Sequence, residues 1–281
     1  MSLWFSELHT PNVKLSFKIK QQLFAKESDY QRIEIFDTYD CGKMLVLDEQ
    51  VMLTEKDEFI YHEMLTHVPL AVNPDIETVL VIGGGDGGIL RELSRYPQIK
   101  HLELVELDEQ VVKACQKYLP KTACGFADPR VKLIYADGLR YVRTKTNAYD
   151  LIVVDSTDPF GPSESLFTRE FYGNCYNALT EKGILVNQHE SPYYIRNRNE
   201  VSKIRRKMQA VFENNYLYQA HIPSYPSGHW LYGFSSKCLH PIKDLQAERW
   251  LKLGLKTDYY NLKLHQGAFA LPNYVLELLR D

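Results

Sequence analysis

The chain has 281 residues, 44% hydrophobic and 25% charged, with a formal net charge of -3. This composition is typical of a soluble globular protein with one large α/β domain and room for a smaller one. The slight acidic excess argues against non-specific nucleic-acid binding. There is no membrane-spanning apolar run and no signal-peptide pattern, so we expect a cytoplasmic protein without a membrane partner. Five scattered cysteines without a Cys-x-x-Cys pair indicate reduced thiols.

Residues 1–53 have the pattern of short antiparallel strands. Apolar and polar residues alternate over 15–19 and again over 31–36, and an apolar run at 42–47 follows a turn signal. Short strands separated by turns predict a small antiparallel β domain. The remaining residues, 54–281, are predicted to form the larger domain.

The larger domain has the pattern of a wound parallel sheet. A helix is expected to begin at Thr54, because Thr54 and Asp57 have the spacing of a capping box. Strands and helices then alternate from residue 77 to about residue 238. Residues 216–236 are predicted to form a closing antiparallel pair, and a short helix is expected after Pro272. The other expected strands are 78–82, 101–105, 131–135, 151–154 and 184–189, and the other expected helices are 108–119, 167–179 and 200–212.

A glycine loop with an acidic residue inside it follows the first strand of this sheet. Residues 83–88 read Gly-Gly-Gly-Asp-Gly-Gly and fit Gly-x-Gly-x-x-Gly, with Glu106 about 20 residues further on as a ribose anchor. The glycines permit a tight turn close to a ligand. Asp86 would repel a pyrophosphate at a helix N-terminus and attract a cation. The plain alternative is a tight turn without a ligand.

Acidic residues follow four successive strands of the expected sheet. They are Asp86, Glu106, Asp137 (followed by Gly138) and Asp155. Ligands bind outside the carboxyl ends of parallel strands, so the pattern predicts a site for a nucleoside together with a polycation. Asp137 could accept a hydrogen bond from an adenine amino group or simply form a turn with Gly138. Asp155 emerges from an apolar strand, so an altered proton affinity and a role as a base are expected.

Two histidines on the first helix invite a comparison with zinc proteases. His62 and His67 are five residues apart, which places them about 140° apart around a helix rather than on one face. We therefore expect no metal, and a packed His62 is the plain alternative to a role in binding. Near the end of the sheet, a turn at 223–228 would present Tyr225 to a cleft.

Together these residues resemble the polyamine aminopropyltransferase family, which includes the spermidine synthases. The resemblance extends from the β region to about residue 230. The motifs that carry it are Tyr30-Gln31, Leu45-Val-Leu-Asp48, Thr54-Glu-Lys-Asp-Glu-Phe59, Tyr61-His-Glu-Met64, the glycine loop 83–88, Asp155-Ser-Thr-Asp-Pro159, Gly161-Pro162, Leu166-Phe167 and Ile222-Pro-Ser-Tyr-Pro-Ser-Gly228.

The resemblance implies an α/β fold: a methyltransferase-like Rossmann domain with a small N-terminal antiparallel β domain, assembled as a homodimer or homotetramer. It implies transfer of the aminopropyl group of decarboxylated S-adenosylmethionine to putrescine, which gives spermidine and 5'-methylthioadenosine. The donor is a co-substrate, so no further cofactor is implied.

The resemblance also implies a role for each matching residue. Asp155 is the general base, and Asp86 binds the ammonium of the donor's aminopropyl group. Residues 156–166 resemble a mobile loop that covers the site. The donor's thioadenosine is held by Gln31, Glu106, Asp137 and Gly138, with Pro162 against the adenine. The amine pocket is formed by Tyr61, His62, Asp86, Asp155, Ser156, Thr157, Asp158, Gln188 and Tyr225.

The sequence departs from the family pattern mainly on the acceptor side. Glu49 stands where the family often has glycine, and residues 191–194 replace a segment that often contains tryptophan. Cadaverine, agmatine or a triamine therefore stay open as acceptors. An S-adenosylmethionine-dependent polyamine N-methyltransferase is the rival reaction, although Asp86 would then face a donor carboxylate. A silent sensor and a nicotinamide dehydrogenase are the remaining rivals.

Overall fold

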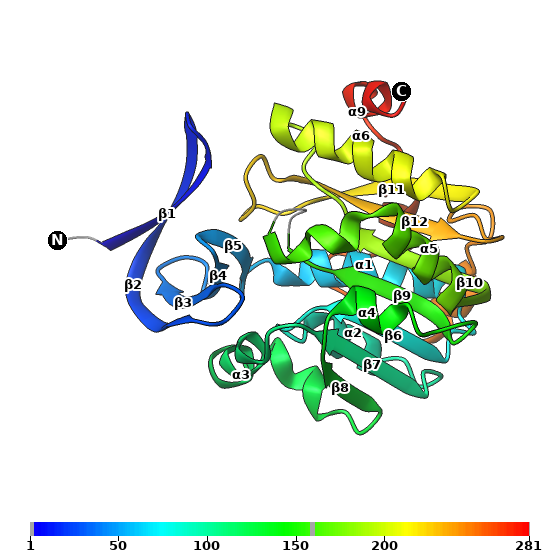
Figure 1. Ribbon diagram of the computed structural model, residues 1–281, viewed down its shortest axis with the longest axis horizontal. Helices are drawn as coiled ribbons and strands as arrows, with labels where there is room; N and C mark the ends of the chain where they lie inside the picture. The colour runs from blue at the N-terminus through cyan, green and yellow to red at the C-terminus, as the bar shows by residue number, and fades with distance from the viewer. Residues whose placement is uncertain (1–2, 158–160, 281) are drawn as a thin grey trace.

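The N-terminal part of the chain is a five-stranded antiparallel sheet. The computed structural model describes residues 3–157 and 161–280. The strands follow one another in sequence order, and the first two form a hairpin that extends away from the rest of the molecule (Figure 1). The strands are β1 (Leu3–Thr10), β2 (Val13–Glu27), β3 (Arg32–Thr38), β4 (Lys43–Leu47) and β5 (Gln50–Thr54).

A two-residue turn joins β4 to β5. Asp48 and Glu49 both have positive φ, 45° and 65°, which is the left-handed region that favours glycine and forms tight hairpin turns. Glycine adopts this backbone more readily than glutamate does, which is consistent with the glycine expected here from the resemblance.

The second sheet has seven strands in the order β11-β12-β10-β9-β6-β7-β8. The strands from β6 to β10 run parallel, and β12 is antiparallel to both of its neighbours. The predicted α/β class and the closing antiparallel pair are therefore confirmed. The strands are β6 (Thr78–Gly83), β7 (His101–Glu106), β8 (Val131–Tyr135), β9 (Tyr149–Asp155), β10 (Leu179–Gln188), β11 (Asn214–His221) and β12 (His229–Ser236).

Helices cover both faces of this sheet. In β6, Val79 and Val81 pack on the side of α1, α2, α7 and α8, whereas Leu80 and Ile82 pack on the side of α4, α5 and α6. This follows from the alternation of side chains along a strand. The helices are α1 (Glu58–Val72), α2 (Gly88–Ser94), α3 (Glu109–Tyr118), α4 (Gly138–Val142), α5 (Arg169–Ala178), α6 (Ile195–Gln209), α7 (Ala247–Lys252), α8 (Leu262–Ala268), α9 (Asn273–Leu278) and the 3-10 helices η1 (Ala123–Ala127) and η2 (Gly161–Phe167).

The predicted start of the first helix is wrong. Thr54 still belongs to β5, and α1 begins at Glu58 after Asp57. The hydroxyl of Thr54 donates to Asp57 at 2.6 Å, and the same carboxylate accepts hydrogen bonds from the backbone N–H and hydroxyl of Ser224. The Asp57 side chain, which the local pattern assigned to capping, therefore binds Ser224 from a distant segment instead. The domain division between residues 53 and 54 stays a prediction.

The two sheets share a hydrophobic core through α3. Val111 and Cys115 of α3 pack against Ile33, Ile35 and Leu45 of the N-terminal sheet. This contact sets β3, β4 and β5 beside the carboxyl ends of the parallel strands. Within the ranges that the structure describes, no helix is long and apolar enough to cross a membrane.

The order of the strands creates a switch point between β6 and β9. From β6 the chain adds β7 and β8 on one side, then returns to add β9 and β10 on the other. Such a reversal opens a crevice at the carboxyl ends of the strands. Gly83 pairs with Asp155 there, and a Cβ on Gly83 would lie 2.0 Å from the Asp155 carbonyl oxygen, so only glycine fits.

Candidate active site

A large cavity opens at this switch point. It contains about 1170 Å³ of empty space, including its open mouth, and Leu45, Leu47 and Met52 of the N-terminal sheet form one wall. The carboxyl ends of the parallel strands and the loop after β6 form the opposite wall. The sequence-predicted residues that line it are Gln31, Tyr61, His62, Asp86, Glu106, Asp137, Gly138, Asp155, Ser156, Thr157 and Tyr225.

A second cavity adjoins the first and shares Tyr61, Ser156, Thr157 and Tyr225 with it. Gln188 lines the second cavity but not the first. Its outer part is acidic: Glu7, Asp48 and Glu49 of the N-terminal sheet belong to its lining. The two cavities together therefore offer a space large enough for a nucleoside, joined to a second space with negative charge in its wall.

Two of the predicted site residues cannot be placed. Asp158 and the side chain of Pro162 lie outside the described residues. Part of the predicted covering loop is described: Ser163, Ser165 and Leu166 of η2 line the first cavity. Thr157 and Ser163 join the two ends of the loop through a hydrogen bond of 2.6 Å between their hydroxyls.

Asp155 is a half-buried carboxyl group with one strong neutral donor. The hydroxyl of Tyr61 donates to its Oδ1 at 2.7 Å. Its Oδ2 is buried, and none of the described residues bonds to it. Burial and the charge of Asp86 raise the pKa of Asp155 to about 7, against the opposing effects of His62 and Tyr61. A carboxyl group in this state exchanges a proton near neutral pH.

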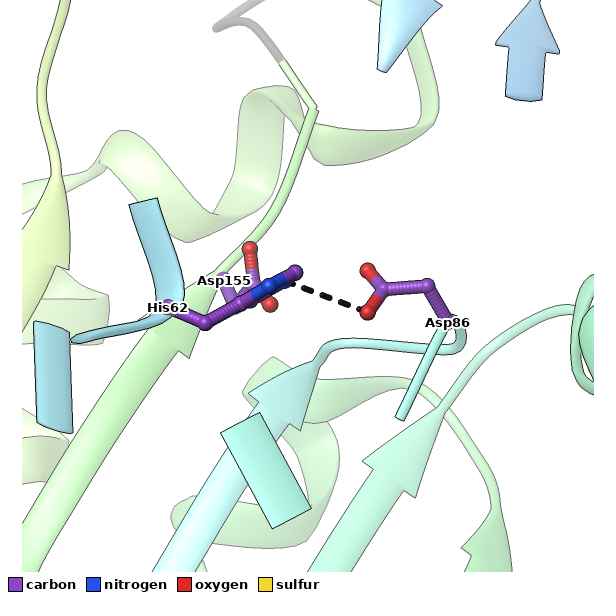
Figure 2. A group of neighbouring side chains, drawn as sticks. All are labelled: His62, Asp86 and Asp155. Carbon is purple, nitrogen blue, oxygen red and sulfur yellow. Dashed lines mark ion pairs between the residues drawn. The ribbon is translucent and has the colours of Figure 1, made fainter. Parts of the chain in front are cut away.

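Asp86 lies opposite, in the glycine loop, with different partners. Its Oδ1 accepts a hydrogen bond from the backbone N–H of Gly88 at 2.7 Å and forms an ion pair with His62 Nε2 at 3.2 Å. Figure 2 shows this pair, with the Asp155 carboxyl group beside the His62 ring. Burial acts to raise the pKa of Asp86, but the charge and hydrogen bond of His62 hold it below its usual value.

His62 is held between two carboxylates. Its Nδ1 lies 2.5 Å from Glu58 Oε2, while its Nε2 faces Asp86. Burial opposes the charged form, but Asp86 and Glu58 together raise the pKa of His62 to about 10. At neutral pH the ring is therefore an imidazolium.

The same three side chains have the spacing of a metal site. His62, Asp86 and Asp155 each offer one atom within 4.8 Å of the others. However, both ring nitrogens of His62 already face carboxylates, Glu58 and Asp86, so the ring offers no free nitrogen to a metal ion. We therefore assign no metal site, and the metal-free site stays a prediction.

Glu106 and Gln31 meet through Asp108. The Glu106 carboxylate accepts a hydrogen bond from the Asp108 N–H at 2.9 Å, and Gln31 Nε2 donates to the Asp108 side chain at 3.1 Å. Burial raises the pKa of Glu106 to about 7. A Cβ on Gly85 would lie 3.0 Å from a carboxylate oxygen of Glu106. Glycine at this position therefore leaves Glu106 its place in the cavity wall.

Asp137 caps a helix at the edge of the cavity, and its hydrogen bond to an adenine stays a prediction. Its side chain caps α4 by accepting a hydrogen bond from the Arg140 N–H at 3.1 Å, and it also lines the first cavity. Gly138 is sterically required, because a Cβ there would lie 2.4 Å from Ile82 Cγ2.

The sequence reasoning assigned no site role to Asp57 and Glu58, which line the first cavity, or to Arg91 behind them. Glu58 hydrogen-bonds both His62 and Arg91, and Asp57 binds Ser224 in the loop that carries Tyr225. Of these contacts only one had a local signal, since residue 58 lies one helical turn before residue 62. The others join segments that are far apart in the sequence.

A Rossmann-like sheet with an acidic cavity at its switch point is the arrangement of an enzyme whose ligand binds at the carboxyl ends of the strands. Two family models match the chain: the spermine/spermidine synthase domain over residues 58–244 and the spermidine synthase tetramerisation domain over residues 3–55.

Known proteins resemble the chain over its whole length. The polyamine aminopropyltransferase of Clostridium botulinum strain Alaska E43 is 57% identical over 281 residues, covering 100% of this chain and 99% of the relative. That of Lachnoclostridium phytofermentans is also 57% identical, over 279 residues, 99% of each chain. The chain therefore belongs to the spermine/spermidine synthase family and is a polyamine aminopropyltransferase.

Solved structures agree with this assignment. Spermidine synthase from Thermotoga maritima has a TM-score of 0.94 and 43% sequence identity, and the match covers 99% of this chain and 94% of that one. A spermidine synthase in complex with the transition-state analogue AdoDATO has a TM-score of 0.96, with the same identity and coverage.

Proposed function

We propose that this aminopropyltransferase is a spermidine synthase: it transfers the aminopropyl group of decarboxylated S-adenosylmethionine to putrescine, with Asp155 as the general base. The observation that carries the proposal is the pair of unlike carboxyl groups in one cavity. Asp86 is held as an anion by His62, whereas Asp155 has a pKa of about 7. One can bind a permanent cation while the other exchanges a proton.

The donor is proposed to occupy the first cavity. Glu106 and Gln31 hold the ribose, and Asp137 and Gly138 lie at the adenine end; the proposed contact of Pro162 with the adenine falls outside the described side chains. Asp86 binds the ammonium of the aminopropyl group, because decarboxylation has left that end of the donor without a carboxylate. A donor that kept its carboxylate would meet the buried negative charge of Asp86, which disfavours the N-methyltransferase reaction.

The acceptor is proposed to enter from the second cavity, which leads to Asp155. Tyr61 and Tyr225 line both this cavity and the first one, as do Ser156 and Thr157 of the covering loop, and His62 lies in the wall of the first cavity. The proposed role of Asp158 in the amine pocket falls outside the described residues. Gln188 lies further along this cavity, where Glu7, Asp48 and Glu49 add negative charge. A diamine that carries a charge at each end matches this distribution.

The transfer step needs one deprotonation and one displacement. Asp155 takes a proton from the acceptor ammonium, which frees the nitrogen lone pair. A nitrogen–carbon bond forms as the carbon–sulfur bond of the sulfonium breaks, and its electron pair returns to sulfur. The products are protonated spermidine and neutral 5'-methylthioadenosine, and the proton on Asp155 passes to solvent. Alignment of the three reacting atoms supplies much of the rate.

We also infer a homo-oligomer, and specifically a homotetramer. The support is the match of residues 3–55 to a tetramerisation domain and the exposed Leu3, Trp4 and Leu8 on β1.

The test is product analysis with a panel of amines. The protein is incubated with decarboxylated S-adenosylmethionine and putrescine, cadaverine, agmatine or spermidine, and methylthioadenosine and products are measured by mass spectrometry. We expect aminopropylated putrescine to dominate. A different preferred amine would keep the mechanism and change the acceptor. Methylated amine formed from S-adenosylmethionine, or no transfer to any amine, would contradict the proposal.

A further inference from the structure

A row of alternating charges runs from the cavity into the protein between α1 and α2. It starts with Asp86 and His62 and continues through Glu58, whose carboxylate accepts two hydrogen bonds from Arg91, at 2.5 Å and 2.9 Å. Arg91 Nε then donates to Glu92 at 2.9 Å. The side chains of His62 and Glu58 are only 2% and 8% exposed, so water screens their interaction little.

Packing fixes the geometry of this row. Glu58 and His62 are one turn apart on α1, and Arg91 is on α2, which packs against α1. A Cβ on Gly88 would lie 2.2 Å from the His62 ring, so the helix start leaves space for the ring alone. The imidazole therefore has one position, with a carboxylate at each nitrogen.

The charge on His62 decides how the two carboxyl groups of the cavity share protons. Asp86 and Asp155 are largely shielded from water, and two such carboxylates side by side disfavour double ionisation, so one of them would hold a proton. An imidazolium beside Asp86 removes this conflict. Glu58 is itself a buried anion that needs a cationic partner. The two hydrogen bonds from Arg91 to its carboxylate supply that partner.

We propose that Glu58 and Arg91 are positioning residues that keep His62 as an imidazolium, so that Asp86 stays ionised for the donor while Asp155 handles the proton. This role rests on the proposed function. Neither residue lies among the groups that the reaction itself requires, and they act through His62.

The sign of the effect follows from the groups that face His62. They are Glu58 and Tyr61 on α1, Asp86 in the glycine loop, Arg91 on α2 and Asp155 on β9. Without the negative charge at position 58, His62 loses its proton at a lower pH. Asp86 and Asp155 then lose the nearby positive charge, and both bind protons more tightly. The acid limb of the activity profile therefore moves to higher pH.

The first test reads the charge of His62 directly. Histidine-labelled protein is titrated by NMR, and the His62 signal is assigned by its absence in His62→Asn. We expect an imidazolium signal up to at least pH 8 in the unsubstituted protein and a titration below pH 8 in Glu58→Gln. A neutral His62 at pH 7 in the unsubstituted protein, or an unchanged charge in Glu58→Gln, would overturn the proposal. This readout does not depend on the reaction that the protein catalyses.

The second test is the pH dependence of kcat/KM for the donor. Glu58→Gln/Arg91→Met removes both charges, so no unpaired buried ion is left to unfold the protein. We expect the acid limb to move up by about one pH unit, so that kcat/KM falls roughly tenfold at any pH on that limb. Arg91→Lys, which keeps the positive charge, should show a smaller shift. Glu103→Gln is the matched control, because its tyrosine-bonded carboxylate lies near the start of β7.

The two failures can be told apart. A uniform loss of activity at every pH in the double variant would show a merely structural pair and overturn the proposal. Absence of aminopropyl transfer by the unsubstituted protein would overturn the proposed function instead, while the NMR titration would still decide the state of His62.

Discussion

Two aspartates in one cavity differ in proton affinity because their partners differ. Asp155 has a neutral tyrosine donor and a buried oxygen that no described residue bonds, so burial dominates and its pKa is about 7. Asp86 has a backbone N–H and an imidazolium, so its charge is stabilised. Environments that push two carboxyl pKa values apart assign the roles of proton carrier and fixed anion.

At this scale, Asp155→Asn tests the base. We expect turnover to fall by roughly 10² to 10⁴-fold, the usual contribution of a general base, while the dissociation constant for methylthioadenosine changes less than about threefold. Tyr61→Phe is the control: it keeps the carboxylate and removes one hydrogen bond, so its loss should be smaller. Near-normal turnover by Asp155→Asn in a steady-state assay would rule out the assignment.

Glu106 gives a second residue-scale prediction. With a pKa of about 7, the Glu106 carboxyl group is mostly protonated below pH 7 in the ligand-free protein. Two ribose hydroxyls can both donate only to the ionised carboxylate, so methylthioadenosine binding should tighten as pH rises through 7 and release a proton near neutrality.

Calorimetry in buffers of different ionisation enthalpy measures this proton. The release should disappear in Glu106→Gln. Proton uptake, or release that is unchanged in the variant, would contradict a ribose contact at Glu106.

At the scale of elements, the two ends of the glycine loop leave no room for a Cβ atom. Gly83 at the end of β6 packs against β9, and Gly88 at the start of α2 packs against the ring of His62 on α1. Glycine is therefore needed in this loop for the packing of α1, α2 and β9 as well as for the turn. This packing accounts for a Gly-x-Gly-x-x-Gly pattern in a loop that carries Asp86 and does not suit a pyrophosphate.

Gly88→Ala and Gly173→Ala form a matched pair. Both glycines are helical, but a Cβ at Gly173 meets nothing within 4 Å. We expect Gly173→Ala to raise stability by about 0.5–1 kcal/mol and Gly88→Ala to lower it by about 1–3 kcal/mol and weaken donor binding. Urea denaturation and calorimetry check both, and equal effects of the two substitutions would mean that the His62 ring yields easily.

At the scale of the whole molecule, one part of the N-terminal sheet packs on the larger domain and another part is exposed. Its β3, β4 and β5 pack on α3 and wall the cavity, whereas the β1–β2 hairpin extends outward (Figure 1). Trp4 and Leu8 are four residues apart on β1, so they lie on the same face of the strand, and both are exposed. Large apolar side chains exposed together are typical of contact surfaces.

Trp4→Asp/Leu8→Asp tests the inferred assembly. Light scattering should give about four times the chain mass of 32.7 kDa for the unsubstituted protein and a smaller multiple for the variant. Leu251→Asp on α7 is the control, since Leu251 is 60% exposed and Leu8 is 69% exposed. A variant that keeps the full mass would exclude the hairpin from the interface.

The sequence by itself was enough for the strand-ending acids Asp86, Glu106, Asp137 and Asp155, because a parallel sheet brings consecutive strand ends to one edge. It also predicted the family, the α/β class and the closing strand pair. The acids and the strands depend on residues close together in the chain, whereas the family followed from a resemblance that extends over several motifs in order.

Only the tertiary structure decided which charges surround those acids. Asp57 had the spacing of a cap, yet it binds Ser224, and the charge of His62 depends on Glu58 with Arg91 behind it. The short helices α7 and α8 were missed in the same way, since they are held by packing rather than by their own pattern. Contacts between distant segments determine burial, and burial with its partners determines proton affinity.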